Sequence, residues 1–152
     1  MATKVYQFGK KKAKNIPLKN KPVEDVQVKK PKDEEIIQPI QGITPDSKEE
    51  YWVAIALQRL DIEFIYHFSI YGGKSFRGGQ VIDFLVYTVP LPTPVFVQGE
   101  YWHGGTKNAT TQFRVAAAQR YFGGEAQPPV EIWDYEIPDR ETTYRVVKRK
   151  LA

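Results

Sequence analysis

From residue 46 onward, apolar positions recur along the chain with two different periods. Helical spacing predicts helices over 46–60, 104–124 and 140–152, and alternation typical of strands predicts strands over 62–70, 80–89, 95–102 and 128–139. Glycine- and proline-rich stretches such as "YGGKSFRGG" and "PLPTP" separate these segments. The order helix, three strands, helix, strand, helix predicts an α/β or α+β sandwich around a mixed sheet.

The first predicted helix carries both a start signal and an apolar face. Asp46 or Ser47 can cap its N-terminus. Glu49 and Glu50 would then lie in the first turn, where the helix dipole favours negative charge. The apolar face comprises Val53, Leu57 and Leu60, flanked by Trp52 and Ala56.

Residues 1–45 differ in pattern from the rest, because no apolar period persists and lysines alternate with prolines. We therefore expect an extended arm over 1–45 and a globular domain over 46–152. Residues 1–32 contain ten lysines and two acids, a net charge of +8, whereas 33–152 carry 12 basic and 16 acidic residues, a net charge of −4. Such an arm can bind phosphates without reading base sequence, and a solvated tail without a partner is the alternative. The candidate DNA contacts in the arm are Lys10, Lys11, Lys12 and Lys14.

Composition narrows the class of protein. With 152 residues, 41% of them hydrophobic, the chain can build one domain with a core. It has no cysteine, which excludes disulfides and zinc–thiolate sites. There is no apolar run long enough to span a membrane and no apolar core of a secretion signal near the N-terminus. We expect a cytoplasmic protein that is neither secreted nor membrane-bound.

Asp83 is the one acid in the apolar run "VIDFLVYTV". An ionised carboxylate is unfavourable in a core unless it is paired or binds a metal. The next predicted strand ends in "QGEYWH", so Gln98, Glu100 and His103 converge with Asp83 if the two strands are neighbours. Carboxylates and carbonyls suit Mg²⁺, whose bound water can attack a phosphodiester, and a histidine can protonate the leaving oxygen. A strand-end aspartate bonded to backbone amides is the alternative.

Four motifs in this order resemble the Vsr-type (very-short-patch-repair) endonucleases of the PD-(D/E)XK superfamily. That family combines a helix with an early glutamate, a strand with "DF", a strand ending in glycine, aromatic, tryptophan and histidine, and a last strand resembling "IWEHEL". The resemblance covers about residues 47–137 and excludes the arm and the tail. The matching positions are Glu50, Asp83, Phe84, Gly99, Tyr101, Trp102, His103, Ile132, Trp133 and Glu136.

The resemblance implies an α/β fold, with a restriction-endonuclease-like αβββαβ core around a mixed sheet and an added C-terminal helix. It also implies a metal-dependent DNA endonuclease of repair or homing type that nicks one strand. Asp83 would be the central ligand of Mg²⁺ or Mn²⁺ beside the backbone carbonyl of Val97, and Glu50 would hold a metal-bound water. His103 would act as acid, base or phosphate clamp.

Further residues would contact DNA if the resemblance holds. Tyr101 and Trp102 would stack on bases, since an aromatic face accepts any base. "RGG" at Arg77 is either a phosphate-binding loop or a hairpin turn. The last predicted helix adds Arg145, Lys148 and Arg149, which alternatively complement the negative end of that helix.

Gln98 departs from the family, which has histidine or often aspartate at this position. Glutamine cannot transfer a proton, although its carbonyl can accept from a water or bind a metal. Glu100, on the same strand face, could replace the missing acid. The family's zinc ligands are absent, so no zinc is expected. The alternative to an active nuclease is an inactive nuclease-fold protein that binds nucleic acid or joins an assembly, for example in a phage, through its arm.

Overall fold

The computed structural model describes residues 35–99 and 107–152. Its main elements are α1 (Lys48–Arg59), β1 (Phe64–Ile70), β2 (Gln80–Val86), β3 (Thr93–Gln98), α2 (Lys107–Phe122), β4 (Val130–Trp133) and α3 (Arg140–Leu151), with short 3-10 helices η1 (Gly73–Ser75) and η3 (Asp134–Glu136). The predicted order of helices and strands is confirmed, and the fold is α/β.

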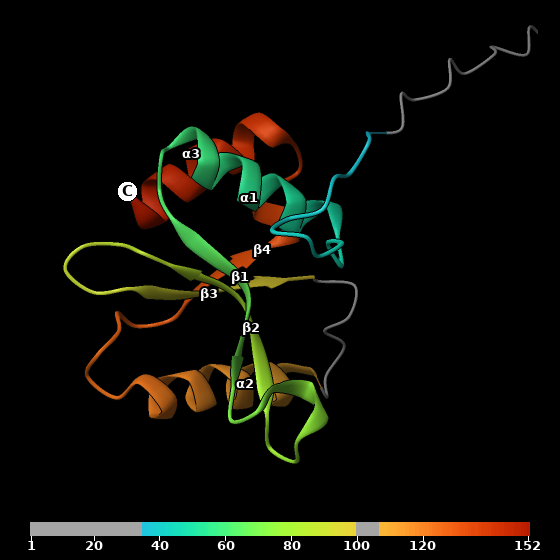
Figure 1. Cartoon of the computed structure of the whole chain (residues 1–152). Coiled ribbons are helices and arrows are strands. Elements are labelled where there is room, and N and C mark those ends of the chain that lie inside the picture. The colour runs from blue at the N-terminus through green and yellow to red at the C-terminus, as the bar shows by residue number, and fades with distance from the viewer. Residues whose placement is uncertain (1–34, 100–106) are drawn as a thin grey trace, which may run out of the picture. The chain divides into compact units, whose positions relative to one another are not determined.

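The four strands form one mixed sheet in the order β1-β2-β3-β4. β1 pairs antiparallel with β2, and β2 with β3, whereas β3 and β4 are parallel and α2 connects them. Helices α1 and α3 cover one face of the sheet and α2 covers the other (Figure 1). The strands that carry Asp83 and Gln98 are therefore neighbours, which was the condition for their side chains to converge.

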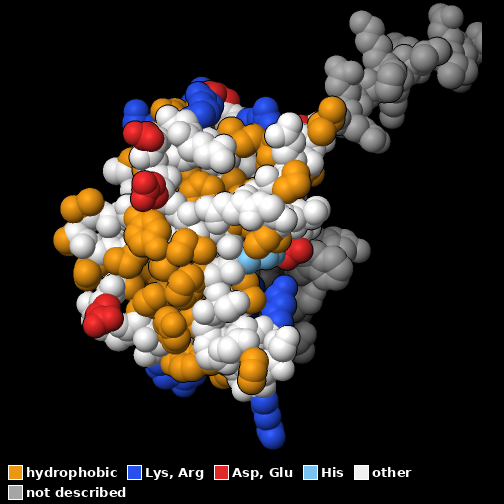
Figure 2. Space-filling model, viewed as in Figure 1, with side chains coloured by type: hydrophobic (Ala, Val, Ile, Leu, Met, Phe, Trp, Pro, Cys, Tyr) orange, Lys and Arg blue, Asp and Glu red, His pale blue; other side chains and the backbone are white. Residues whose placement is uncertain are grey.

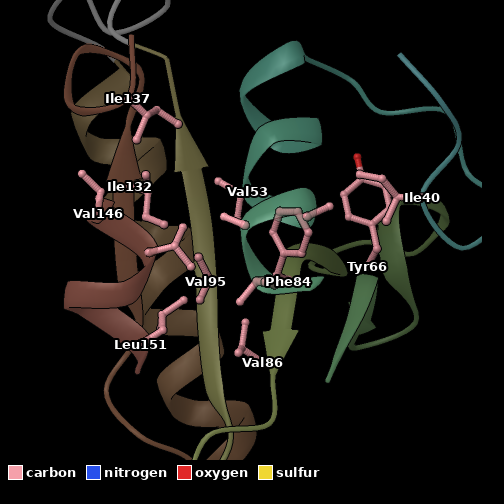
Figure 3. Packing of buried hydrophobic residues seen from close by; sticks show 14 residues of the cluster. Ile40, Val53, Tyr66, Phe84, Val86, Val95, Ile132, Ile137, Val146 and Leu151 are labelled. Carbon is pink, nitrogen blue, oxygen red and sulfur yellow. The ribbon is translucent and has the colours of Figure 1, made fainter. Parts of the chain in front are cut away.

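The larger hydrophobic core lies between the sheet and the α1/α3 layer. Val53 and Leu57 of α1 are fully buried, as the apolar period predicted, and Leu60 packs at the edge of the cluster. Figure 3 shows Val53 facing the strand residues Phe84 and Val95. A second, smaller cluster lies under α2, and its buried members are Ile70, Ile82, Phe96, Ala117 and Ala118.

α2 buries a face of small residues. Ala117 and Ala118 are nearly inaccessible, whereas Phe113 and Tyr121, which share helical spacing with Ala117, are 54% and 42% exposed. Small side chains let the helix lie close to the sheet. The helix itself was predicted, but the position of its buried face follows from the packing.

The β1–β2 hairpin changes face in its middle. Tyr66 and Phe84 belong to the α1/α3 core, whereas Phe68 and Ile82 pack under α2. Residues two apart normally share a face of a strand. The exception coincides with His67, whose φ of 54° lies in the left-handed region. The end of the hairpin consequently lies beside α2 (Figure 1).

One compact unit spans Glu35–Ala152, so residues 35–45, at the end of the predicted arm, pack with the domain. Ile40 is 4% exposed within the core, and the Gln41 side chain accepts from Tyr66 N and donates to Phe64 O. Glu35 accepts a 2.7 Å hydrogen bond from Trp52 Nε1. The sequence did not predict this packing because a segment that docks through single side chains has no period.

In the two described ranges, no helix is both long enough and apolar enough to cross a membrane.

Candidate functional site

A polar cavity of about 430 Å³ opens where α1, the β1–β2 hairpin, β3 and α2 meet. Its lining includes Asp46, Glu50, His67, Asp83 and Arg114. A second cavity of about 280 Å³ shares Asp46 and Glu50 with the first and reaches the end of β3. At the surface, histidine atoms (pale blue) lie next to acidic and basic side chains (Figure 2).

Glu50 enters the site from the first turn of α1. Ser47 caps the helix by accepting from Glu50 N at 3.2 Å, as predicted. The Glu50 side chain is buried and accepts a hydrogen bond from the Tyr66 hydroxyl. Burial, and then the negative charge of Asp83, raise the pKa of Glu50 to about 7. Burial therefore outweighs the favourable position at the helix N-terminus.

Asp83 lies on β2 with only 9% of its surface exposed. Its Oδ2 accepts from Val97 N at 2.8 Å, and its Oδ1 lies 3.5 Å from Arg114 Nη2. Burial raises the pKa of Asp83, although Arg114, the Val97 N–H and His67 act in the opposite direction. A bond from a backbone amide was the alternative role that the sequence offered for Asp83. In the structure Asp83 accepts such a bond and also lines the cavity.

His67 and Asp46 were not predicted as site residues. His67 Nε2 lies 3.6 Å from both Asp46 Oδ2 and Glu50 Oε2. One ligand atom from each of the three residues falls within 4.8 Å of the others, so they could hold a metal ion. The register pairs Tyr66 with Phe84 and Phe68 with Ile82, so His67 and Asp83 lie between the same two pairs. The sequence signal for His67 was a histidine in the strand before the "DF" strand. It could be interpreted only once the pairing of the two strands was known.

The cavity also has basic side chains. Arg114 comes from α2, donates to Val81 O at 3.1 Å and lies 5.1 Å from the Phe96 ring. Lys74 is exposed on η1 and contributes to the lining. Arg114 and Lys74 both lie in segments outside the motifs that suggested a nuclease. Neither was predicted as a site residue, because their positions depend on how α2 and the hairpin pack.

The end of β3 contributes Val97 and Gln98. Gln98 is 3% exposed, and its Nε2 has no hydrogen-bond partner among the described residues. Gln98 lines the second cavity with Glu50. Gln80 lines the first, and its buried Oε1 likewise lacks a partner within the described part of the chain. Buried amide groups without partners are uncommon in folded proteins.

The remaining predicted residues do not join this group. Arg77 is exposed in the β1–β2 connection, and Arg145, Lys148 and Arg149 are exposed on α3, where they line neither cavity. The predicted residues that lie outside the described ranges are Lys10, Lys11, Lys12, Lys14, Glu100, Tyr101, Trp102 and His103.

Comparisons with family models, curated proteins and solved structures find no match to this chain. Any functional conclusion therefore rests on the residues themselves.

The donor set fits a divalent cation. Carboxylate oxygens and an imidazole nitrogen are ligands of Mg²⁺, Mn²⁺ and Zn²⁺. The three acids Asp46, Glu50 and Asp83 face the same cavity, and mutual repulsion favours binding of positive charge there. The positive charges of Arg114 and Lys74 would attract an anion to the same cavity.

Proposed function

We propose that this protein hydrolyses phosphodiester bonds in DNA with the help of a divalent cation. The observation that carries the proposal is the convergence of two buried carboxylates, Glu50 and Asp83, from separate elements on one cavity that also contains a histidine and an arginine. Perturbed buried acids in a polar cavity are typical of catalytic sites. Both acids were expected in this role from the motifs.

The topology agrees with the proposed fold family. A helix is followed by three antiparallel strands, a crossover helix and a strand parallel to the third. This is the αβββαβ arrangement expected of a restriction-endonuclease-like core. Fold alone does not define activity, so the proposal depends on the side chains in the cavity.

The side chains have separable tasks in this proposal. Glu50 and Asp83 would supply negative charge around a divalent cation, which when bound would lower the pKa of a water and stabilise charge on the phosphate. Arg114 and Lys74 are placed to bind the phosphate oxygens of the substrate. Gln98 Nε2 can donate a hydrogen bond to the attacking water or to a phosphate oxygen, but it cannot remove a proton.

The test is nicking of supercoiled plasmid by the full chain in Mg²⁺ or Mn²⁺. Asp83→Asn should reduce nicking at least ~100-fold, because the substitution removes a charge at the reacting centre. Asp61→Asn is the matched control, since Asp61 has a φ of 56°, a conformation that asparagine tolerates, and lines neither site cavity. Equal loss in both variants, or none in Asp83→Asn, would refute the assignment.

An inactive nuclease fold is the second candidate, and two contacts of Asp83 favour it. Arg114 and the Val97 N–H already provide positive partners for Asp83, as a bound cation would. In that case the wild-type protein binds DNA in a salt-dependent manner without nicking in either metal. Asp83→Asn would then leave DNA affinity within about twofold of wild type.

A further inference from the structure

We infer that the divalent cation of the proposed function is held by Asp46, Glu50 and His67, and that His67 makes the site prefer Mn²⁺ to Mg²⁺. The catalytic role of the ion rests on the proposed function, but ion binding can be measured without DNA cleavage. It assigns direct binding of the ion to Asp46 and His67 beside Glu50 instead of to the expected Asp83 and Val97 carbonyl, and Asp83 contributes its charge from the wall of the same cavity.

The distances support a shared ion better than they support direct hydrogen bonds. His67 Nε2 is 3.6 Å from each of the two carboxylates, which is too long for a hydrogen bond. Donor atoms bound to one ion at about 2.1 Å lie about 3–3.5 Å apart when they are neighbours in its shell. A movement of a few tenths of an ångström would bring His67 to that spacing from each carboxylate, and the ligand atoms of Asp46 and Glu50 lie within 4.8 Å of each other.

The charges around the three residues are unbalanced. Among the described residues, no lysine or arginine forms an ion pair with Asp46 or Glu50, and His67 is the one basic side chain within 4 Å of their carboxylates. Asp83 differs, because Arg114 and the Val97 N–H already occupy its two oxygens. The missing positive charge is therefore at Asp46 and Glu50.

A separate observation indicates an absent ligand next to this group. Only 3% of the surface of Gln98 is exposed, and its Nε2 has no hydrogen-bond partner in the described part of the chain. It lines the cavity that Asp46 and Glu50 also line. Since Nε2 is a donor, it suits an anionic oxygen that is itself bound to a cation at these carboxylates.

The histidine sets the expected metal preference. Mg²⁺ prefers oxygen ligands and retains its waters, whereas imidazole binds later first-row ions more readily. A set of two carboxylates and one imidazole therefore favours Mn²⁺ over Mg²⁺. The nitrogen ligand also provides a spectroscopic signature, because ¹⁴N coupling to bound Mn²⁺ is detectable by pulsed electron paramagnetic resonance.

The experiment titrates the full chain with Mn²⁺, without DNA, and follows the loss of the free-ion resonance and the appearance of ¹⁴N coupling. Mg²⁺ affinity is measured by competition. Wild type should show nitrogen coupling and bind Mn²⁺ at least ~10-fold more tightly than Mg²⁺. His67→Asn, chosen because asparagine tolerates the φ of 54°, should abolish the coupling and reduce the Mn²⁺ preference about tenfold.

Two further variants keep the result interpretable. Asp46→Asn removes an exposed ligand and should weaken Mn²⁺ binding, whereas Asp61→Asn, which is outside the ligand set and lines neither site cavity, should not. Bound Mn²⁺ without nitrogen coupling, or unchanged metal preference in His67→Asn, would overturn the inference even if plasmid nicking depends on Asp83. Nitrogen-coupled Mn²⁺ in a protein that never nicks DNA would support the site and refute the nuclease.

Discussion

At the scale of single residues, Glu50 shows how position and burial oppose each other. The first turn of a helix stabilises a negative charge, by up to about 1 kcal/mol at an exposed site. Removal from water acts the other way, and burial is the largest contribution to the raised pKa of Glu50. The Tyr66 hydroxyl compensates only in part by donating to the carboxylate. Glu50 is thus held in the site at the expense of stability.

Glu50 should make the metal-free protein less stable as pH rises. Its pKa is 4.5 in the unfolded chain and about 7 in the folded protein, so between these values the folded state binds more protons. The free energy of unfolding should fall between pH 4.5 and 7, by about 3 kcal/mol in total from this group. Urea denaturation in EDTA from pH 5 to 8 measures this decrease, which Glu50→Gln should largely remove. The same slope in Glu50→Gln as in Glu49→Gln would contradict the prediction.

Sequence reasoning identified some site residues and missed others for one physical reason. Asp83 stood out because it interrupts an apolar strand, and Glu50 because it lies in the first turn of a helix and matches a motif position. His67 and Arg114 reach the cavity through strand register and helix packing. Those depend on contacts between residues far apart in the chain, which local patterns do not encode.

At the scale of elements, the β1–β2 hairpin shapes one wall of the site. Its connection includes η1, which places Lys74 at the cavity. Gly72, Gly73 and Gly78 have φ values between 76° and 88° there, a region that favours glycine. The sequence suggested a hairpin turn in "YGGKSFRGG", and that is confirmed. The reversal of face at His67 was not predicted, because strand alternation was assumed to continue.

Gly79 is the position in this connection where a side chain cannot fit. A Cβ atom there would lie 1.9 Å from Gly73 O, a contact that requires the backbone to move. Gly79→Ala should lower the free energy of unfolding by about 2–3 kcal/mol. Gly124→Ala is the control, since its Cβ would meet no atom within 4 Å, and it should change stability by less than about 0.5 kcal/mol. Urea denaturation compares the two, and similar values would show that the connection adapts freely.

At the scale of the whole molecule, the charge is divided between the two parts of the chain. Residues 1–32 have a net charge of +8 and residues 33–152 a net charge of −4. An acidic domain repels a polyanion, while attraction to phosphates falls steeply with salt. DNA affinity in the proposed function should therefore depend mainly on the lysines of the N-terminal part.

Replacing Lys10, Lys11, Lys12 and Lys14 together by glutamine should weaken DNA binding and flatten its salt dependence. Each lost phosphate contact should reduce the slope of log K against log salt by about 0.9. Fluorescence anisotropy on duplex DNA from low to moderate salt measures the slope. The matched control replaces the same four lysines by arginine, which keeps the charge and should keep the slope. An unchanged slope in the glutamine variant would assign binding to other residues.

The sequence by itself determined the order of helices and strands, a cap at Asp46 or Ser47, the burial of Val53 and Leu57, and Asp83 as the acid that interrupts an apolar strand. These follow from interactions within a few residues. The tertiary structure decided that residues 35–45 pack with the domain, that α2 buries alanines, and that His67 and Asp46 meet Glu50. Such features arise only when distant segments pack, because register and helix docking choose which side chains share a cavity.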